Sequence, residues 1–212
     1  MAGSWAPRMT NLDLDTPHGI ARAHLRLRAD ARGALILGHG AGGGVAAPDL
    51  RAVADAAGAV GLSVALIEQP YRVAGRRSPA PARQLDIAWT AVVDALREEQ
   101  LEALPLIVGG RSAGARVACR TAESTGAVGV LSLAFPLQPP RRAGSTPAPS
   151  RIEELDGVEV PTLVIQGERD PFGIPPAAPL RTVVLVTGDH SLKADLDRVA
   201  AAAEAWLRDV LE

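Results

Sequence analysis

Short, uninterrupted apolar runs recur along the chain, with polar or helix-periodic stretches between them. Because both alternating positions of each run are apolar, the runs are typical of parallel strands buried on both faces. They span residues 34–37, 63–67, 106–108, 128–133, 162–165 and 182–186. Parallel strands need long crossover connections, usually helices. The pattern therefore predicts an α/β fold with a doubly wound, mostly parallel sheet flanked by helices.

Three stretches between or after these runs have helical spacing. The first follows Pro48, a favoured first helical residue, and stops near Gly61. The other two each present one apolar face, formed by Leu85, Trp89, Val92 and Leu96 and by Leu192, Leu196, Val199, Ala203, Trp206 and Val210.

The N-terminal part has a different pattern. Ala21, Ala23, Leu25 and Leu27 alternate with polar residues, which predicts an edge strand with one solvated face. Residues 1–19 show no period and are predicted to be an irregular leader. A chain of 212 residues is then expected to be a single domain, 1–212.

Charge and cysteine content limit the expected partners and compartment. The formal net charge of −2 creates no field that would attract nucleic acid or an anionic membrane, so neither partner is expected. The single cysteine, Cys119, cannot form an intramolecular disulfide, and the sequence contains no apolar stretch typical of a signal peptide or a membrane span. The expected location is the cytoplasm. No residue cluster has metal-ligand spacing, so we expect no metal or cofactor.

The strongest chemical signal is the G-x-S-x-G pentapeptide Gly110-Arg111-Ser112-Ala113-Gly114, directly after an apolar run. A nucleophile elbow needs small residues two positions on either side of the serine, because the strand-to-helix turn brings these backbones close together. The pattern predicts Ser112 as a nucleophile. A glycine-rich turn with a capping serine is the structural alternative.

A serine nucleophile needs a base and a carboxylate that orients the base. His190 follows the run at 182–186 and precedes the last helix, which makes it the best-placed histidine. Asp170 follows the run at 162–165, and its short side chain lies further along the loop than that of its competitor Glu168. Asp189 is a weaker third candidate.

Acyl transfer also needs N–H donors for the developing oxyanion. The glycine-rich segment Gly38–Gly44 leaves the strand at 34–37 and can expose backbone amides there. We expect Ala41 and Ala113 to supply the two oxyanion donors, and His39 to support the loop rather than to transfer protons.

The same segment contains a G-x-G-x-x-G pattern at Gly38, Gly40 and Gly43, followed later by Glu68. This is an alternative signal for a nucleotide-binding protein. The following helix, however, is predicted to begin only at Pro48, so its N-terminus would not face a pyrophosphate.

The glycine-rich loop, the elbow, the Asp170 loop and His190 follow one another in the order that the α/β-hydrolase superfamily uses. The chain resembles this superfamily over nearly its whole length. More narrowly, Gly109 to Gly114 and Phe135-Pro136-Leu137 resemble the small dienelactone-hydrolase-like branch that includes a testis-expressed protein and a chromatin-complex subunit. The resemblance implies an α/β-hydrolase fold, with Ser112 as nucleophile, His190 as base, Asp170 as acid and the Ala41 and Ala113 amides as oxyanion donors.

Two features depart from this resemblance. Dienelactone hydrolases proper have a cysteine nucleophile where this chain has Ser112, so their substrate is not carried over. The helices usual around the acid strand are reduced here to proline-rich stretches such as Pro171–Pro179, and no cap domain is expected.

Arginines gather after two of the predicted strands, together with Tyr71. If these loops meet at one sheet edge, they form a basic rim for an anionic substrate; otherwise they are solvated loop residues. The candidate substrate-binding residues are Tyr71, Arg76, Arg77, Arg141 and Arg142.

Together these observations predict a cofactor-free serine hydrolase of small soluble carboxylic esters or thioesters. One alternative is a non-catalytic scaffold or binding module that retains the elbow for its fold. A second is a nucleotide-binding protein that uses residues Gly38 to Gly43.

Overall fold

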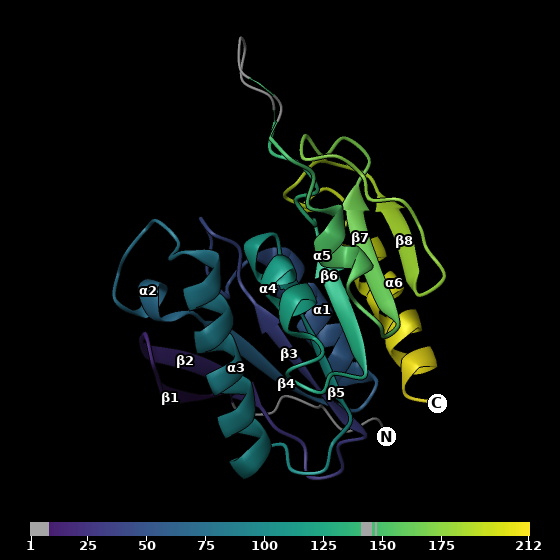
Figure 1. Ribbon diagram of the computed structural model, residues 1–212. Helices are drawn as coiled ribbons and strands as arrows, with labels where there is room; N and C mark the ends of the chain where they lie inside the picture. Colours follow the sequence, from purple (N-terminus) through teal and green to yellow (C-terminus); the bar gives the residue numbers. More distant parts are fainter. Residues whose placement is uncertain (1–8, 141–145, 147) are drawn as a thin grey trace.

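The computed structural model describes residues 9–140, 146 and 148–212. Within these residues an eight-stranded sheet has the order β1-β2-β4-β3-β5-β6-β7-β8 and carries helices on both faces (Figure 1). The strands are β1 (Thr10–Thr16), β2 (Gly19–Arg26), β3 (Gly33–Gly38), β4 (Leu62–Glu68), β5 (Leu106–Arg111), β6 (Gly129–Leu133), β7 (Thr162–Gly167) and β8 (Arg181–Val186). The helices are α1 (Pro48–Ala59), α2 (Pro70–Val73), α3 (Ala82–Glu99), α4 (Ala113–Thr121), α5 (Ile152–Asp156) and α6 (Leu196–Val210).

Strands β3 to β8 are parallel to one another, and β4 pairs antiparallel with β2, which confirms the predicted doubly wound, mostly parallel sheet. The apolar positions of the central strands alternate between two cores. In β5, Val108 packs in the core beneath α3 and α4, whereas Ile107 packs in the core beneath α1 and α6. Burial on both faces explains why these strands are continuously apolar.

The prediction of an irregular leader is wrong for residues 10–16, which form β1. This strand pairs antiparallel with β2, from Thr10 opposite Leu25 to Thr16 opposite Gly19. Leu12 and Leu14 pack against the core, while Asp13 forms an ion pair with Arg22 (2.6 Å) on the solvated face. The edge strand is therefore β1, and β2 lies one position inside the sheet, contrary to the prediction.

The opposite edge also differs from expectation. In β8, Thr182 and Leu185 are exposed, so this apolar run is not buried on both faces. Leu192 precedes α6 and has a left-handed backbone (φ 54°), so it is not part of the predicted helix. The short helices α2 and α5 were not predicted.

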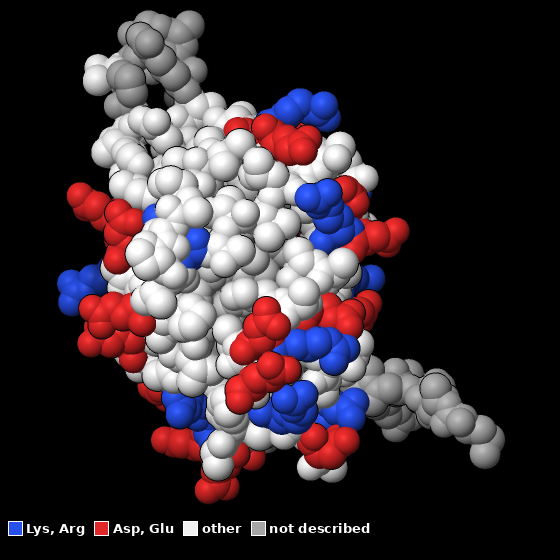
Figure 2. Space-filling view, turned by 90° about the vertical axis from the view of Figure 1, so that its right-hand side faces the viewer, with Lys and Arg blue, Asp and Glu red and all other residues white. Residues whose placement is uncertain are grey.

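The carboxyl ends of β3 to β8 lie at one edge of the sheet, and that edge has no cap domain in the described part of the chain. Between β6 and β7, the only helix among the described residues is the five-residue α5. No described helix is both long and apolar enough to cross a membrane. On the face shown in Figure 2, basic and acidic side chains are interspersed without an extended area of one sign.

Candidate active site

Ser112 lies in the sharp turn between β5 and α4. Its backbone angles, φ 52° and ψ −106°, are unusual for a residue with a side chain and indicate local strain. The turn requires small neighbours, because a Cβ at Gly110 or Gly114 would lie 2.5 Å or 2.4 Å from the Gly38 carbonyl oxygen. The Ser112 side chain projects at the carboxyl edge of the sheet and is partly exposed, which leaves it accessible to a small molecule.

His190 and Asp170 form a hydrogen-bonded chain with Ser112. The Nε2 atom of His190 lies 2.9 Å from Ser112 Oγ, and its Nδ1 atom lies 2.8 Å from Asp170 Oδ2. Because an ionised carboxylate only accepts hydrogen bonds, Nδ1–H donates to Asp170 and Nε2 is left to accept the serine proton. This is the arrangement that a nucleophile, a base and an orienting acid require.

The structure brings Asp170, rather than its two competitors, to His190. The Asp170 side chain is fully buried, and its Oδ1 accepts a hydrogen bond from the Phe172 amide at 2.8 Å. Glu168 is exposed, and the exposed Asp189 accepts a hydrogen bond from the Ser191 amide.

Two residues that support this chain were missed from the sequence. Gln166, fully buried at the end of β7, donates from Nε2 to Asp170 Oδ2 (2.8 Å). The ring of Phe172 packs against that of His190, with 4.3 Å between ring centroids and 38° between planes. The only sequence signal for Gln166 is that a polar residue stands near the end of an otherwise apolar strand. No sequence pattern indicates the ring contact of Phe172, because it depends on the tertiary structure.

The glycine-rich loop after β3 lies against the elbow. A Cβ at Gly40 would be 3.6 Å from the Ser112 Cβ, so the next peptide group is adjacent to the nucleophile. Ala113 is the first residue of α4, and its N–H has no carbonyl partner within the helix. The glycine-rich loop at Gly40 and the N-terminus of α4 at Ala113 thus both lie beside Ser112.

His39 holds the peptide group that contains the Ala41 amide. The Gln69 N–H donates to His39 Nε2 at 3.1 Å, so the proton of the neutral ring is on Nδ1, which donates to the Gly40 carbonyl at 2.8 Å. The Gly40 carbonyl and the Ala41 N–H belong to one planar trans peptide. His39 therefore orients that N–H, as expected for a loop-supporting role. On the other side, Tyr71 donates from its hydroxyl to the Ala41 carbonyl at 3.2 Å.

Burial lowers the pKa of His39 below its usual value of 6.5. Between pH 6.5 and the lower pKa of the folded state, the unfolded chain binds more protons at this position than the folded chain does. We therefore expect the free energy of unfolding to fall as the pH decreases through this window, and the stability to be fully present above it. In His39→Gln this pH dependence should be weaker.

Urea unfolding between about pH 5 and about pH 7.5 measures this effect. His18→Gln is the matched control, because it removes an exposed histidine from the turn between β1 and β2. An equal pH dependence in wild type and His39→Gln would show that His39 does not titrate between the folded and unfolded states.

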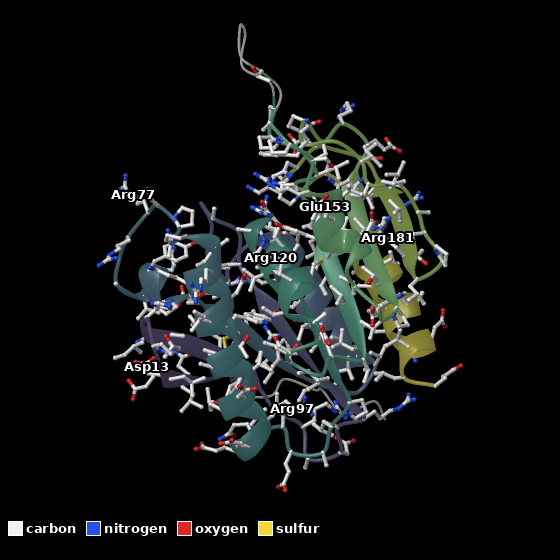
Figure 3. All side chains as sticks on the ribbon, in the orientation of Figure 1. Asp13, Arg77, Arg97, Arg120, Glu153 and Arg181 are labelled. Carbon is white, nitrogen blue, oxygen red and sulfur yellow. The ribbon has the colours of Figure 1, made fainter. Side chains whose placement is uncertain are left out.

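The candidate substrate-binding residues are only partly brought to this site. Tyr71 and Arg76 line a cavity of about 390 Å³ between the β1–β2 turn, α2 and α3. Arg77 is exposed and projects outward from the loop after α2 (Figure 3). Arg141 and Arg142 lie outside the described residues.

Other titratable residues named in the sequence have partners of their own. Glu68 Oε2 pairs with His24 Nε2 at 3.0 Å, while its Oε1 would lie 3.9 Å from a Cβ at Gly44, beside the glycine-rich loop. In the described ranges, no group of three or more His, Cys, Asp or Glu side chains could hold a metal ion.

A model of the alpha/beta hydrolase domain family matches residues 31–209. No curated protein is significantly similar to the chain in sequence. Among solved structures, a serine hydrolase without a lid from Xanthomonas campestris is similar, with a TM-score of 0.75 and 21% identity over 97% of this chain and 96% of that one. Est1E from Butyrivibrio proteoclasticus has a TM-score of 0.76 and 14% identity over 94% and 98% of the two chains.

A dienelactone hydrolase from Anabaena variabilis has a TM-score of 0.74 and 18% identity, over 96% of this chain and 98% of that one. At these identities the solved structures establish a common fold, and they agree with the dienelactone-hydrolase-like resemblance. Because the family model spans most of the chain and includes the elbow, the Asp170 loop and His190, the protein belongs to the alpha/beta hydrolase domain family.

Proposed function

We propose that the protein is a serine hydrolase that cleaves small soluble carboxylic esters or thioesters through an acyl-enzyme on Ser112. The observation that supports this most is the continuous hydrogen-bonded chain from Ser112 Oγ through His190 to the buried Asp170. A scaffold that kept the elbow only for its fold would have no need for a buried carboxylate oriented toward a histidine.

In the proposed mechanism, His190 Nε2 removes the proton from Ser112 Oγ as Oγ attacks the ester carbonyl carbon. The resulting oxyanion accepts hydrogen bonds from the Ala41 and Ala113 amides. His190 then donates the proton to the leaving alcohol or thiol as the C–O or C–S bond breaks. Water, activated by His190, hydrolyses the acyl-enzyme and releases the carboxylic acid. The side chains of this chain carry every proton transfer.

The similar structures support an ester as the substrate class. They include the esterase domain of a Rhodothermus marinus protein, Est1E with bound ferulic acid, and a serine hydrolase without a lid. None of Ser112, Asp170 and His190 lines the cavity beside Tyr71 and Arg76, and its link to the nucleophile is the hydrogen bond from Tyr71 to the Ala41 carbonyl. The proposal that Arg76 binds an anionic group of the substrate rests on this link. We propose that the protein acts in the cytoplasm, because its single cysteine, Cys119, is a free, buried thiol.

A fluorophosphonate probe tests the proposal directly. We expect the probe to increase the mass of the protein by one phosphonyl group, and peptide mapping to locate this group on Ser112. A panel of nitrophenyl esters and thioesters of different acyl length, each in a neutral and an anionic form, defines the substrate class. Absence of both labelling and hydrolysis would favour the scaffold, and a thermal shift with nucleotides would favour the nucleotide-binding alternative.

A further inference from the structure

Arg111, the residue directly before the nucleophile, contacts helix α1 and two loops of the candidate active site. Its Nε lies 2.8 Å from Asp49 Oδ2, and its Nη2 donates to the backbone carbonyl of His190 at 2.9 Å. Its Nη1 lies against Gly40, where a Cβ would approach it to 2.9 Å. One guanidinium thus joins the elbow, the His190 loop and the glycine-rich loop.

Asp49 is the buried counter-charge of this guanidinium. Its side chain is 1% exposed, in the first turn of α1, and burial raises the pKa of its carboxyl group while the charge of Arg111 opposes that rise. Arg111 itself is largely buried, with 18% of its side chain exposed. A buried carboxylate is costly unless a cation compensates it, so the pair holds Arg111 in one place.

The contact with His190 is made through the main chain. The two ring nitrogens of His190 bond to Ser112 and Asp170, which orients the imidazole. The His190 loop lies between β8 and α6. The Arg169 N–H donates to the Gly188 carbonyl at 2.9 Å, which fixes the start of the His190 loop to the Asp170 loop. The hydrogen bond from Arg111 to the His190 carbonyl ties the loop to β5, the strand that carries Ser112.

We propose that Arg111 is a positioning residue for the hydrolase reaction: anchored by Asp49, it sets the distance between His190 and Ser112 and supports the glycine-rich loop at Gly40. The proposal rests on the proposed function, because it assigns a role within that site. It also requires an arginine, since a guanidinium presents several donors in a rigid plane, whereas a lysine is a single flexible charge. Lysine could pair with Asp49 or bond to the His190 carbonyl, but it could not reproduce both contacts.

Three variants separate positioning from charge compensation. Arg111→Met leaves Asp49 buried and unpaired, so we expect it to lower the melting temperature as well as the activity. The double variant Arg111→Met/Asp49→Asn removes both charges and should regain most of the lost stability. Arg111→Lys keeps the charge but loses the planar arrangement of donors.

If Arg111 positions His190, the double variant and Arg111→Lys should both retain a kcat about 10²-fold below that of the wild type, with KM little changed. This is the loss expected when a catalytic group is displaced by about 1 Å. Recovery of the wild-type kcat in the double variant would overturn the proposal, because Arg111 would then serve only to neutralise Asp49.

Arg120→Lys is the matched control. Arg120 lies on α4 (Figure 3) and forms a forked pair with Asp86, at 2.9 Å and 2.6 Å, away from the hydrogen-bonded chain of Ser112, His190 and Asp170. Replacing Arg120 with lysine also removes contacts made by two guanidinium nitrogens, but at the far end of α4 from Ser112. We expect Arg120→Lys to lower the melting temperature while kcat stays at the wild-type value.

An NMR measurement tests the proposal without turnover. The Nδ1–H proton of His190, assigned by its absence in His190→Gln, should give a sharp low-field signal in the wild type and a broadened or absent signal in the double variant. An unchanged signal in the folded double variant would overturn the positioning role even if the protein hydrolyses no ester. Failure of the phosphonate probe to label the wild type would instead overturn the proposed function.

Discussion

Replacing Ser112 with alanine is expected to lower kcat for ester hydrolysis by about 10³-fold or more and to abolish phosphonate labelling. Alanine removes the attacking oxygen while leaving His190, Asp170 and the backbone amides in place. The far-ultraviolet circular dichroism spectrum and the unfolding midpoint should stay close to those of the wild type. A variant that retained kcat within tenfold of the wild type would rule out Ser112 as the nucleophile.

Ser112→Gly is a second variant of the same position with a different expected stability. The Ser112 backbone, at φ 52° and ψ −106°, is strained for any residue with a Cβ. Such strain costs about 1 to 3 kcal/mol, and glycine tolerates this region better. We expect Ser112→Gly to be as inactive as Ser112→Ala but more stable than it by about 1 kcal/mol. Chemical denaturation of the two variants measures the difference, which would be absent if the elbow were relaxed.

Gly114→Ala is expected to destabilise the protein by about 3 kcal/mol or more, at the upper end of overpacking effects. The new Cβ would lie 2.4 Å from the carbonyl oxygen and 2.5 Å from the carbonyl carbon of Gly38, and 2.9 Å from the His39 carbonyl oxygen. All three are main-chain atoms, so no side chain can rotate away to relieve the clash. Either α4 or the end of β3 must move.

That movement should also reduce activity, because β3 leads into the loop that carries Ala41. Urea unfolding and phosphonate labelling measure the two effects. Gly43→Ala is the matched control for stability: no other atom lies within 4 Å of a Cβ at Gly43, and its φ is not in the left-handed region. We expect Gly43→Ala to change the free energy of unfolding by less than about 0.5 kcal/mol. Equal unfolding midpoints for the two variants would contradict the close approach of α4 to β3.

Local chemistry explains why much of the fold and the elbow could be predicted from the sequence. A strand buried on both faces must be apolar at every position, and an amphipathic helix must repeat its apolar residues with helical spacing. The elbow could also be predicted from Gly110 and Gly114, because the turn around Ser112 leaves no room for a Cβ at these two positions. The placement of Ser112, Asp170 and His190 at one edge of the sheet could also be predicted, because each of them follows an apolar run.

The first strand was missed because its residues alternate weakly and its stability depends on a partner. Leu12 and Leu14 stabilise the strand only when β2 pairs with it and the core packs against their side chains. Pairing of this kind is a tertiary property. A seven-residue polar segment has no internal hydrogen bonds that would indicate a strand.

The precise contacts of the candidate active site depended on distances between loops that are far apart in sequence. The sequence left Asp170 and Glu168 as alternatives because both follow the same strand, and only the path of the loop turns Asp170 inward to His190. The contact between Arg111 and the His190 carbonyl joins residues 79 positions apart. The local sequence determined which strands and helices form and which residues follow them, because these features depend on periodicity and backbone sterics. The tertiary structure alone decided which side chains of the active site meet, because these contacts depend on how the packed loops approach one another.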